Sequence, residues 1–145
     1  MLQKWSDRWS GLSGVFLRWG LAFVYLFSGY SKLFAGNDTI GVCSNRVEAI
    51  TLVASYQFIP LDPEVFVIVQ SVLELILGLA LALGWKIRWA GLISAVLILL
   101  FFVFIDFQLI WKNMALLGAS LALIVTKENR WSMDNRLSSK SLSSV

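Results

Sequence analysis

The chain has 145 residues, 58% of them hydrophobic and 14% charged, with a mean hydropathy of +0.75 and a formal net charge of +3. Soluble domains are about 45–50% apolar, so this composition excludes an ordinary soluble domain and predicts one compact integral membrane protein. Because the sequence has no histidine and only one cysteine, Cys43, it also excludes histidine-ligated haem or zinc, Ser-His-Asp catalysis and an intrachain disulfide.

The first predicted membrane-spanning helix covers about residues 15–34 and follows an N-terminal segment, 1–14. Its apolar stretch is longer than the hydrophobic region of a signal peptide, and no convincing small-x-small cleavage site follows it, so a retained helix is expected. Residues three or four apart form a stripe that is expected to face the other helices, because small and polar residues drive helix contacts in a bilayer. The stripe consists of Arg18, Ala22, Tyr25, Gly29 and Lys32.

Residues 35–64 form the one long connection between predicted spans, on the outer side. Asn45 is a candidate N-cap with Glu48 three residues on, which is the spacing of a capping box. Apolar side chains then recur at helical spacing, at Val47, Ile50, Ala54 and Phe58. This pattern predicts a short amphipathic helix. Two placements stay open for it: flat at the membrane interface, or packed on the bundle as a lid.

Three further spans are predicted, at about residues 65–85, 89–107 and 109–126. The inward stripe of the second span is expected to consist of Gln70, Glu74, Gly78 and Ala82. The corresponding stripe of the fourth span consists of Ala115, Gly118, Ala119 and Ala122. The third span carries the bulky run "LLFFVF" and is expected to face lipid, so the other three stripes would meet inside the bundle.

The basic residues predict how the bundle is oriented. Of the 12 Lys and Arg residues, nine lie before or at the start of the first span, between the second and third, or after the fourth. Since basic residues favour the cytoplasmic side, both termini are predicted to be cytoplasmic, including a serine-rich tail at 127–145 that is expected to be disordered. The sequence thus predicts an all-α fold, an integral membrane antiparallel four-helix bundle over residues 15–126 with an amphipathic helix in its outer loop.

The predicted inner turn between the second and third spans reads "GWKIRWAG" and contains Lys86 and Arg88. These two cations are expected to set the topology and to lie near lipid phosphates. The tryptophans lie at or near predicted helix ends, which is typical of an aromatic belt at the headgroups. A stacking site for a ligand is the alternative for any one of them.

Polar residues collect in the outer half of the predicted bundle. A charge near the middle of a span costs about 2.5–3.5 kcal/mol on insertion scales, so Glu74 is expected to be paired, hydrogen-bonded or protonated, and Lys32 is its predicted counter-charge. Three roles stay open: an ion pair that only fixes helix register, a polar pocket for a small ligand such as a quinone headgroup, and a proton relay. No catalytic residue and no metal site is identified. The predicted polar cluster consists of Lys32, Gln70, Glu74, Asp106, Lys112, Asn113 and Tyr30.

Cys43 lies in the outer loop, where it is expected to be a free surface thiol. The alternative, in an oxidising exterior, is an intermolecular disulfide with a partner. The sequence has no basic groove with interleaved aromatic residues, so nucleic acid is not expected as a partner.

The segments "LRWGLAFVYLFSGYSKLF" and, after Pro60, "ELILGLALALGWKIRWAG" resemble the DoxX family of small four-helix membrane proteins. The pattern S-G-x-x-K-L followed by E-x-x-L-G-x-x-L-x-x-G carries the resemblance, which covers about residues 17–125. The motif positions of the family fall on Ser28, Gly29, Lys32, Glu74, Gly78, Gly84 and Arg88. Helix packing is expected at the small residues Ser28, Gly29, Gly78, Gly84 and Gly118.

The resemblance implies a location in the bacterial inner membrane and association with membrane redox systems, such as the thiosulfate:quinone oxidoreductase subunit called DoxD. It thereby implies an accessory subunit of a redox- or quinone-linked complex, without a cofactor of its own, in contact with other membrane subunits or with copies of itself. The alternative is a stand-alone component or carrier that binds a quinone or a small sulfur compound through Lys32 and Glu74. A related branch, MauE, handles disulfides, which the single cysteine argues against.

Overall fold

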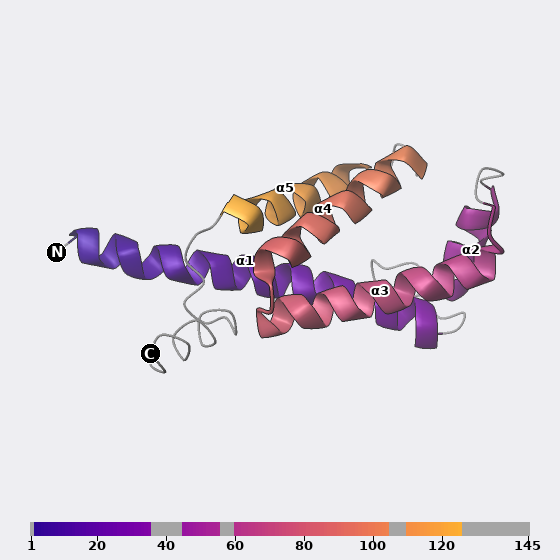
Figure 1. Ribbon diagram of the computed structural model, residues 1–145, viewed down its shortest axis with the longest axis horizontal. Helices are drawn as coiled ribbons and strands as arrows, with labels where there is room; N and C mark the ends of the chain where they lie inside the picture. The colour runs from indigo at the N-terminus through magenta and orange to yellow at the C-terminus, as the bar shows by residue number, and fades with distance from the viewer. Residues whose placement is uncertain (1, 36–44, 56–59, 105–109, 126–145) are drawn as a thin grey trace, which may run out of the picture. The chain divides into compact units, whose positions relative to one another are not determined.

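The computed structural model describes residues 2–35, 45–55, 60–104 and 110–125, and every regular element in these ranges is an α-helix (Figure 1). The helices are α1 (Leu2–Phe34), α2 (Arg46–Ser55), α3 (Pro63–Leu83), α4 (Ile87–Phe104) and α5 (Ile110–Val125). The all-α prediction is confirmed, and α1, α3, α4 and α5 lie where the four spans are predicted. The segment 1–14 is not a separate element, because α1 is already helical from Leu2.

Two helical segments of the described chain are long and apolar enough to cross a membrane, Leu12–Phe34 in α1 and the whole of α3. The apolar parts of α4 and α5, Ile87–Leu100 and Asn113–Val125, are shorter than the roughly 20 residues that a full crossing needs. Crossings by α4 and α5, and with them the four-span topology, therefore stay predictions.

The helices belong to two compact units. One, here called the α1–α3 unit, is Phe23–Leu79 and holds the C-terminal third of α1, the whole of α2 and most of α3. The other, the α4–α5 unit, joins Met1–Ala22 to Ala80–Val145. Within it, α4 and α5 pack against each other along their length (Figure 1).

In the α4–α5 unit, small residues let the two helices approach closely. A Cβ atom added to Gly91 would lie 3.2 Å from the carbonyl oxygen of Ser120 and 3.2 Å from Cγ1 of Ile124. The hydroxyls of Ser94 and Ser120 share a hydrogen bond of 2.6 Å, and both residues are fully buried. Such a bond between helices is worth about 0.6 kcal/mol on average in a bilayer protein, so it selects a packing face more than it stabilises the unit.

Within the α4–α5 unit, the residues that α5 turns toward α4 differ from the stripe predicted to face inward. Ala115, Gly118 and Ala122 are exposed, whereas Ser120 and Leu123 are fully buried. The prediction favoured the smallest side chains. Instead, α5 turns the hydroxyl of Ser120 toward Ser94 and packs Leu123 into the contact with α4. Ala115 and Ala122 stay exposed.

On α1 the predicted stripe is confirmed, because all five of its members are buried. On α3 the stripe is only partly right: Glu74 and Gly78 are buried, but Gln70 and Ala82 are half-buried. Uniform steps of four residues drift around a helix of 3.6 residues per turn, whereas the observed buried positions alternate steps of four and three. The buried positions on α3 are Val67, Ser71, Glu74, Leu77, Gly78 and Leu81.

The predicted capping box at the start of α2 is confirmed. Asn45 Oδ1 accepts a hydrogen bond from the backbone N–H of Glu48 at 2.8 Å, and Glu48 Oε2 accepts one from the backbone N–H of Asn45 at 3.4 Å. These two bonds satisfy backbone donors that the first turn of a helix leaves open, which explains why α2 begins here.

The buried face of α2 differs from the predicted one. Ala49 and Val53 are buried against Val67 of α3, and Ile50 packs beside them. Arg46 also forms an ion pair with Glu64 at the start of α3. Of the other residues in the predicted face, Val47 and Ala54 are exposed and Phe58 lies outside the described residues. These contacts favour the lid placement, in which α2 packs on α3.

A cap that the sequence prediction missed starts α3. Asp62 Oδ1 accepts hydrogen bonds from the backbone N–H groups of Glu64 (2.9 Å) and Val65 (3.3 Å). Pro63 occupies the first helical position, where its missing N–H costs nothing and its fixed φ suits the helix. The "PLDP" stretch therefore starts a helix.

A Schellman motif ends α3. The backbone N–H of Trp85 donates to the carbonyl of Ala80 (2.9 Å), that of Gly84 donates to the carbonyl of Leu81 (3.2 Å), and Gly84 has a left-handed φ of 72°. Lys86 follows with φ 46°, and its carbonyl accepts the N–H of Ala90 at 2.9 Å, so α4 begins immediately. Gly84 thus has a role in the turn that the packing prediction did not include, and it is also buried.

Replacing Gly84 with alanine is expected to lower the free energy of unfolding by about 1–2 kcal/mol, because a Cβ atom is disfavoured at φ 72°. Replacement with asparagine should cost less, since asparagine visits the left-handed region more readily. Thermal unfolding in detergent, followed by circular dichroism, measures both variants. Equal losses for alanine and asparagine would contradict the explanation by backbone conformation.

Candidate functional site

A buried ion pair joins α1 to α3 in the α1–α3 unit. Lys32 Nζ, in the last turn of α1, donates to Glu74 Oε1, in the middle of α3, at 2.7 Å. The side chains are only 9% and 6% exposed. Gln70, one turn before Glu74 on the same helix, also donates to Oε1, through Nε2 at 2.9 Å. Three of the residues in the predicted polar cluster therefore meet at one carboxylate oxygen.

The close approach of the two helices positions this ion pair. A Cβ atom added to Gly29 would lie 2.8 Å from the carbonyl oxygen of Ser71 and 2.9 Å from Cγ of Leu75, so only glycine fits there. Gly29 is one turn before Lys32 on α1, and Ser71 is one turn before Glu74 on α3. The missing side chain of Gly29 thus lets the lysine reach the glutamate directly.

The second carboxylate oxygen of Glu74 is the unusual feature of the site. Oε2 is buried, yet no group among the described residues donates a hydrogen bond to it. Buried polar atoms are nearly always hydrogen-bonded, because leaving one unsatisfied costs about 1–3 kcal/mol. The two donors on Oε1 and the open Oε2 make Glu74 able to accept a hydrogen bond from a hydroxyl or amine of a small ligand, or to hold a proton.

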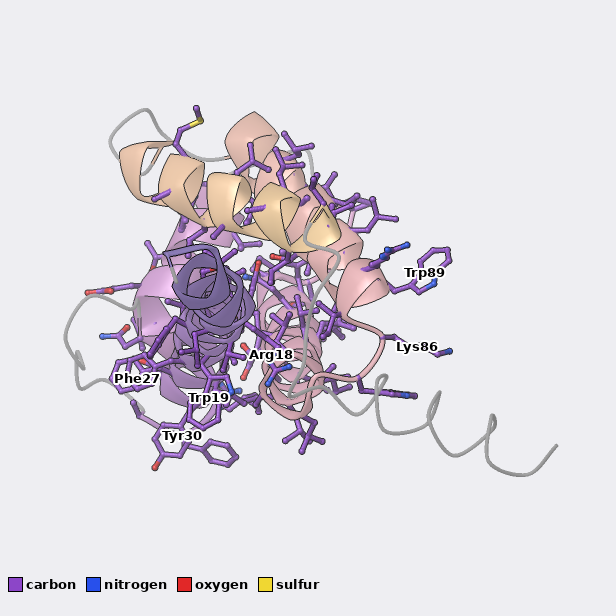
Figure 2. All side chains as sticks on the ribbon, turned by 90° about the vertical axis from the view of Figure 1, so that its left-hand side faces the viewer. Arg18, Trp19, Phe27, Tyr30, Lys86 and Trp89 are labelled. Atoms are coloured by element: carbon purple, nitrogen blue, oxygen red, sulfur yellow. The ribbon has the colours of Figure 1, made fainter. Side chains whose placement is uncertain are left out.

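Tyr30, a fourth member of the predicted cluster, does not join the ion pair. Tyr30 is 52% exposed, and its ring lies against Phe34 with centroids 5.2 Å apart, on the outside of the helix (Figure 2). Because Tyr30 is two residues before Lys32, it points to roughly the opposite side of α1. Its predicted place in the cluster is wrong.

Of the other predicted site residues, two lie on α5 and two lie outside the described residues. Asn113 is half-buried on α5, in the other unit, and Lys112 lies in the first turn of the same helix. Asp106 and Cys43 lie outside the described residues, so their predicted roles stay predictions.

The predicted packing residues also separate into distinct roles. Gly29 lies at a tight helix contact and Gly78 is buried, whereas Ser28 is only half-buried. Gly118 is exposed, and a Cβ atom there would meet nothing within 4 Å. Gly91, which supports the contact between α4 and α5, is not among the predicted packing residues, because the third span was expected to face lipid.

Arg18 is a second buried cation that the cluster prediction did not include. It is 2% exposed and belongs to the α4–α5 unit (Figure 2). Its place in the buried stripe of α1 was the signal that could have identified it. Among the described residues, no three His, Cys, Asp or Glu side chains gather where they could hold a metal ion.

One comparison with known proteins gives a match. The family model described as DoxX matches residues 14–106, which include Lys32, Gln70 and Glu74. No curated protein and no solved structure matches the chain significantly.

Proposed function

Because the chain belongs to the DoxX family of membrane proteins, we propose that it is an accessory subunit of a larger redox assembly and contributes a quinone-binding site at Lys32, Gln70 and Glu74. The observation that carries this proposal is the buried Oε2 of Glu74, to which no residue in the described part of the chain donates a hydrogen bond. A quinone carbonyl accepts hydrogen bonds, which the lysine and the amide can donate. The hydroxyl of the reduced form donates one, which Oε2 can accept.

The composition supports the accessory role. Without histidine and with a single cysteine, the chain has few of the side chains that usually hold haem or run a disulfide relay. The chain would therefore bind and orient the quinone, and a partner subunit would supply or take its electrons. Exposed apolar side chains along α3 and α4 give it surface for lipid and for such partners.

The proposed topology is the predicted one: four crossings by α1, α3, α4 and α5 in a bacterial inner membrane, with the N-terminal segment and the tail in the cytoplasm. The positions of these four helices and the basic residues support it. In this topology the lid helix α2 lies on the outer side, on the same half of α3 as Gln70 and Glu74.

The test of the site measures quinone that stays with the purified protein. Wild type purified in mild detergent should carry quinone in a molar amount close to that of the protein. Glu74→Gln should lower the affinity for quinone about 10- to 100-fold. The range corresponds to the loss of a charge-assisted hydrogen bond worth about 1.5–3 kcal/mol. Quinone extracted from each preparation and separated by liquid chromatography gives the occupancy.

Two further variants make this measurement decisive. Lys32→Met/Glu74→Leu replaces the ion pair with apolar side chains of similar volume, so it should insert and fold yet carry no quinone. Tyr30→Phe changes an exposed ring on the same turn of α1 and should retain the quinone. Full occupancy in the double variant would refute the site.

The accessory role has its own test. Proteins that migrate with the wild type in mild detergent are identified by mass spectrometry, and stable partner subunits are expected. A lone monomer that still carries quinone would instead favour the stand-alone component or carrier.

A further inference from the structure

The hydrogen-bond donors around Glu74 are unevenly divided between its two carboxylate oxygens. Lys32 Nζ at 2.7 Å and Gln70 Nε2 at 2.9 Å both donate to Oε1. Oε2 is buried, and no group in the described part of the chain donates to it. In its ion pair with Lys32, Glu74 is a carboxylate, which accepts hydrogen bonds and donates none. The site therefore presents to a ligand one buried acceptor that the described residues leave open.

This open acceptor distinguishes the two redox forms of a quinone. The reduced form, quinol, has a hydroxyl where the oxidised form has a carbonyl. A hydroxyl can donate to Oε2 and also accept a hydrogen bond, whereas a carbonyl oxygen only accepts. An ammonium has several N–H groups, so Lys32 can donate to the oxygen of either form. The two forms thus differ in how they meet Oε2, where the carbonyl would place one acceptor against another.

Burial makes this difference large. The side chains of Lys32 and Glu74 are only 9% and 6% exposed, so bulk water has little access to the carboxylate. A buried acceptor costs free energy when it is left without a donor, and a hydrogen bond to a charged group is stronger than one between neutral groups. On this basis the form that satisfies Oε2 is expected to bind about 10- to 100-fold more tightly than the form that does not.

We infer that the Glu74 site binds quinol in preference to quinone. The inference rests on the proposed quinone site and names the redox form that this site holds. A quinone becomes a quinol by taking up two electrons and two protons, so tighter binding of quinol raises the reduction potential of the bound couple. Each tenfold preference corresponds to about 30 mV for a two-electron couple, so the expected rise is about 30–60 mV. The site therefore suits an assembly that reduces quinone rather than one that oxidises quinol.

The test compares the affinities of the wild type for decylubiquinone and decylubiquinol. The full chain in mild detergent, washed free of its own quinone, is titrated with each form under nitrogen, and calorimetry gives the two dissociation constants. Decylubiquinol should bind about 10- to 100-fold more tightly. The dimethyl ether of decylubiquinol, in which methoxy groups replace both hydroxyls, cannot donate a hydrogen bond and should lose this advantage.

Two variants compare the ratio of the two dissociation constants, so a general loss of affinity does not imitate the result. In Glu74→Gln an amide replaces the carboxylate and can donate to a carbonyl, so the preference for quinol should disappear or reverse. Tyr30→Phe removes an exposed hydroxyl from the outside of α1 and should keep the ratio of the wild type. A ratio unchanged in Glu74→Gln would overturn the inference.

The wild-type titration separates this inference from the proposed function. Equal affinity for the two forms would overturn the preference and leave the quinone site in place. Tighter binding of decylubiquinone would also overturn the preference, because Oε2 would then carry a proton and act as a donor. Binding of neither form would overturn the proposed site together with the preference. These results need no variant, so they decide the question even if Glu74→Gln fails to fold.

Discussion

Replacing Glu74 with leucine alone is expected to lower the free energy of unfolding by about 3–5 kcal/mol, because it leaves a buried lysine without its counter-charge. Lys32 Nζ and Glu74 Oε1 are 2.7 Å apart, and both side chains are more than nine-tenths buried. Gln70, which donates to Oε1 in the wild type, is neutral and cannot supply the missing counter-charge. The lysine would have to become neutral or bring a water molecule into the buried contact, and both cost free energy.

The matched double variant separates the ion pair from the space it fills. In Lys32→Met/Glu74→Leu neither charge remains, and apolar side chains of similar volume occupy the contact between α1 and α3. Buried ion pairs replaced in this way are often neutral or even stabilising, so we expect stability within about 1 kcal/mol of wild type. Denaturant unfolding in detergent, followed by circular dichroism, gives both values. A double variant as unstable as Glu74→Leu would show that leucine disturbs the packing itself.

Replacing Gly29 with alanine is expected to destabilise the α1–α3 unit by about 1–3 kcal/mol, the usual cost of overpacking. The added Cβ atom would lie 2.8 Å from a backbone carbonyl oxygen on α3, that of Ser71, and 2.9 Å from Leu75 Cγ. A backbone atom cannot rotate aside as a side chain can, so α1 and α3 must separate. The separation would also stretch the hydrogen bond between Lys32 and Glu74.

Gly20 supplies the control on the same helix. It is exposed, and a Cβ atom there would meet nothing within 4 Å. Gly20→Ala should therefore be neutral or stabilise the protein by about 0.5–1 kcal/mol through better helix propensity. The shift in unfolding midpoint relative to wild type, measured in the same detergent, compares the two variants. If Gly20→Ala lost as much stability as Gly29→Ala, close helix contact would not be the cause.

The parts of the site that could be predicted follow from rules that act along the chain. A carboxylate inside an apolar helix needs a partner, which made Lys32 the expected neighbour of Glu74, and the structure has that contact. The capping box of α2 is equally local, since Asn45 and Glu48 are three residues apart. The positions of the four long helices follow from the lengths of the apolar segments in the sequence. That the ion pair binds a ligand stays a prediction.

The parts that could not be predicted depend on which neighbour a helix meets. The face of α5 is set by the hydroxyl of Ser94 on another helix, which no pattern within α5 records. The face of α2 is set by Val67, where a cluster with Ala49 and Val53 forms. The exposed place of Tyr30 could have been derived, because two residues on a helix separate it from Lys32 by roughly half a turn. The predicted cluster grouped residues only by their depth in the membrane and did not consider which side of the helix each one faces.

The spacing of the buried positions in the α1–α3 unit carries a further consequence. The buried positions that recur at steps of four and three are Tyr25, Gly29 and Lys32 on α1 and Val67, Ser71, Glu74 and Gly78 on α3. Steps of four and three match the seven-residue spacing, 3.5 residues per turn, that keeps one face of a helix turned toward its neighbour. One residue inserted within the repeat would rotate every later position by about 100° and carry Glu74 away from Lys32. Insertions or deletions that keep the contact between Lys32 and Glu74 are therefore expected in whole heptads, or outside the repeating segments of α1 and α3.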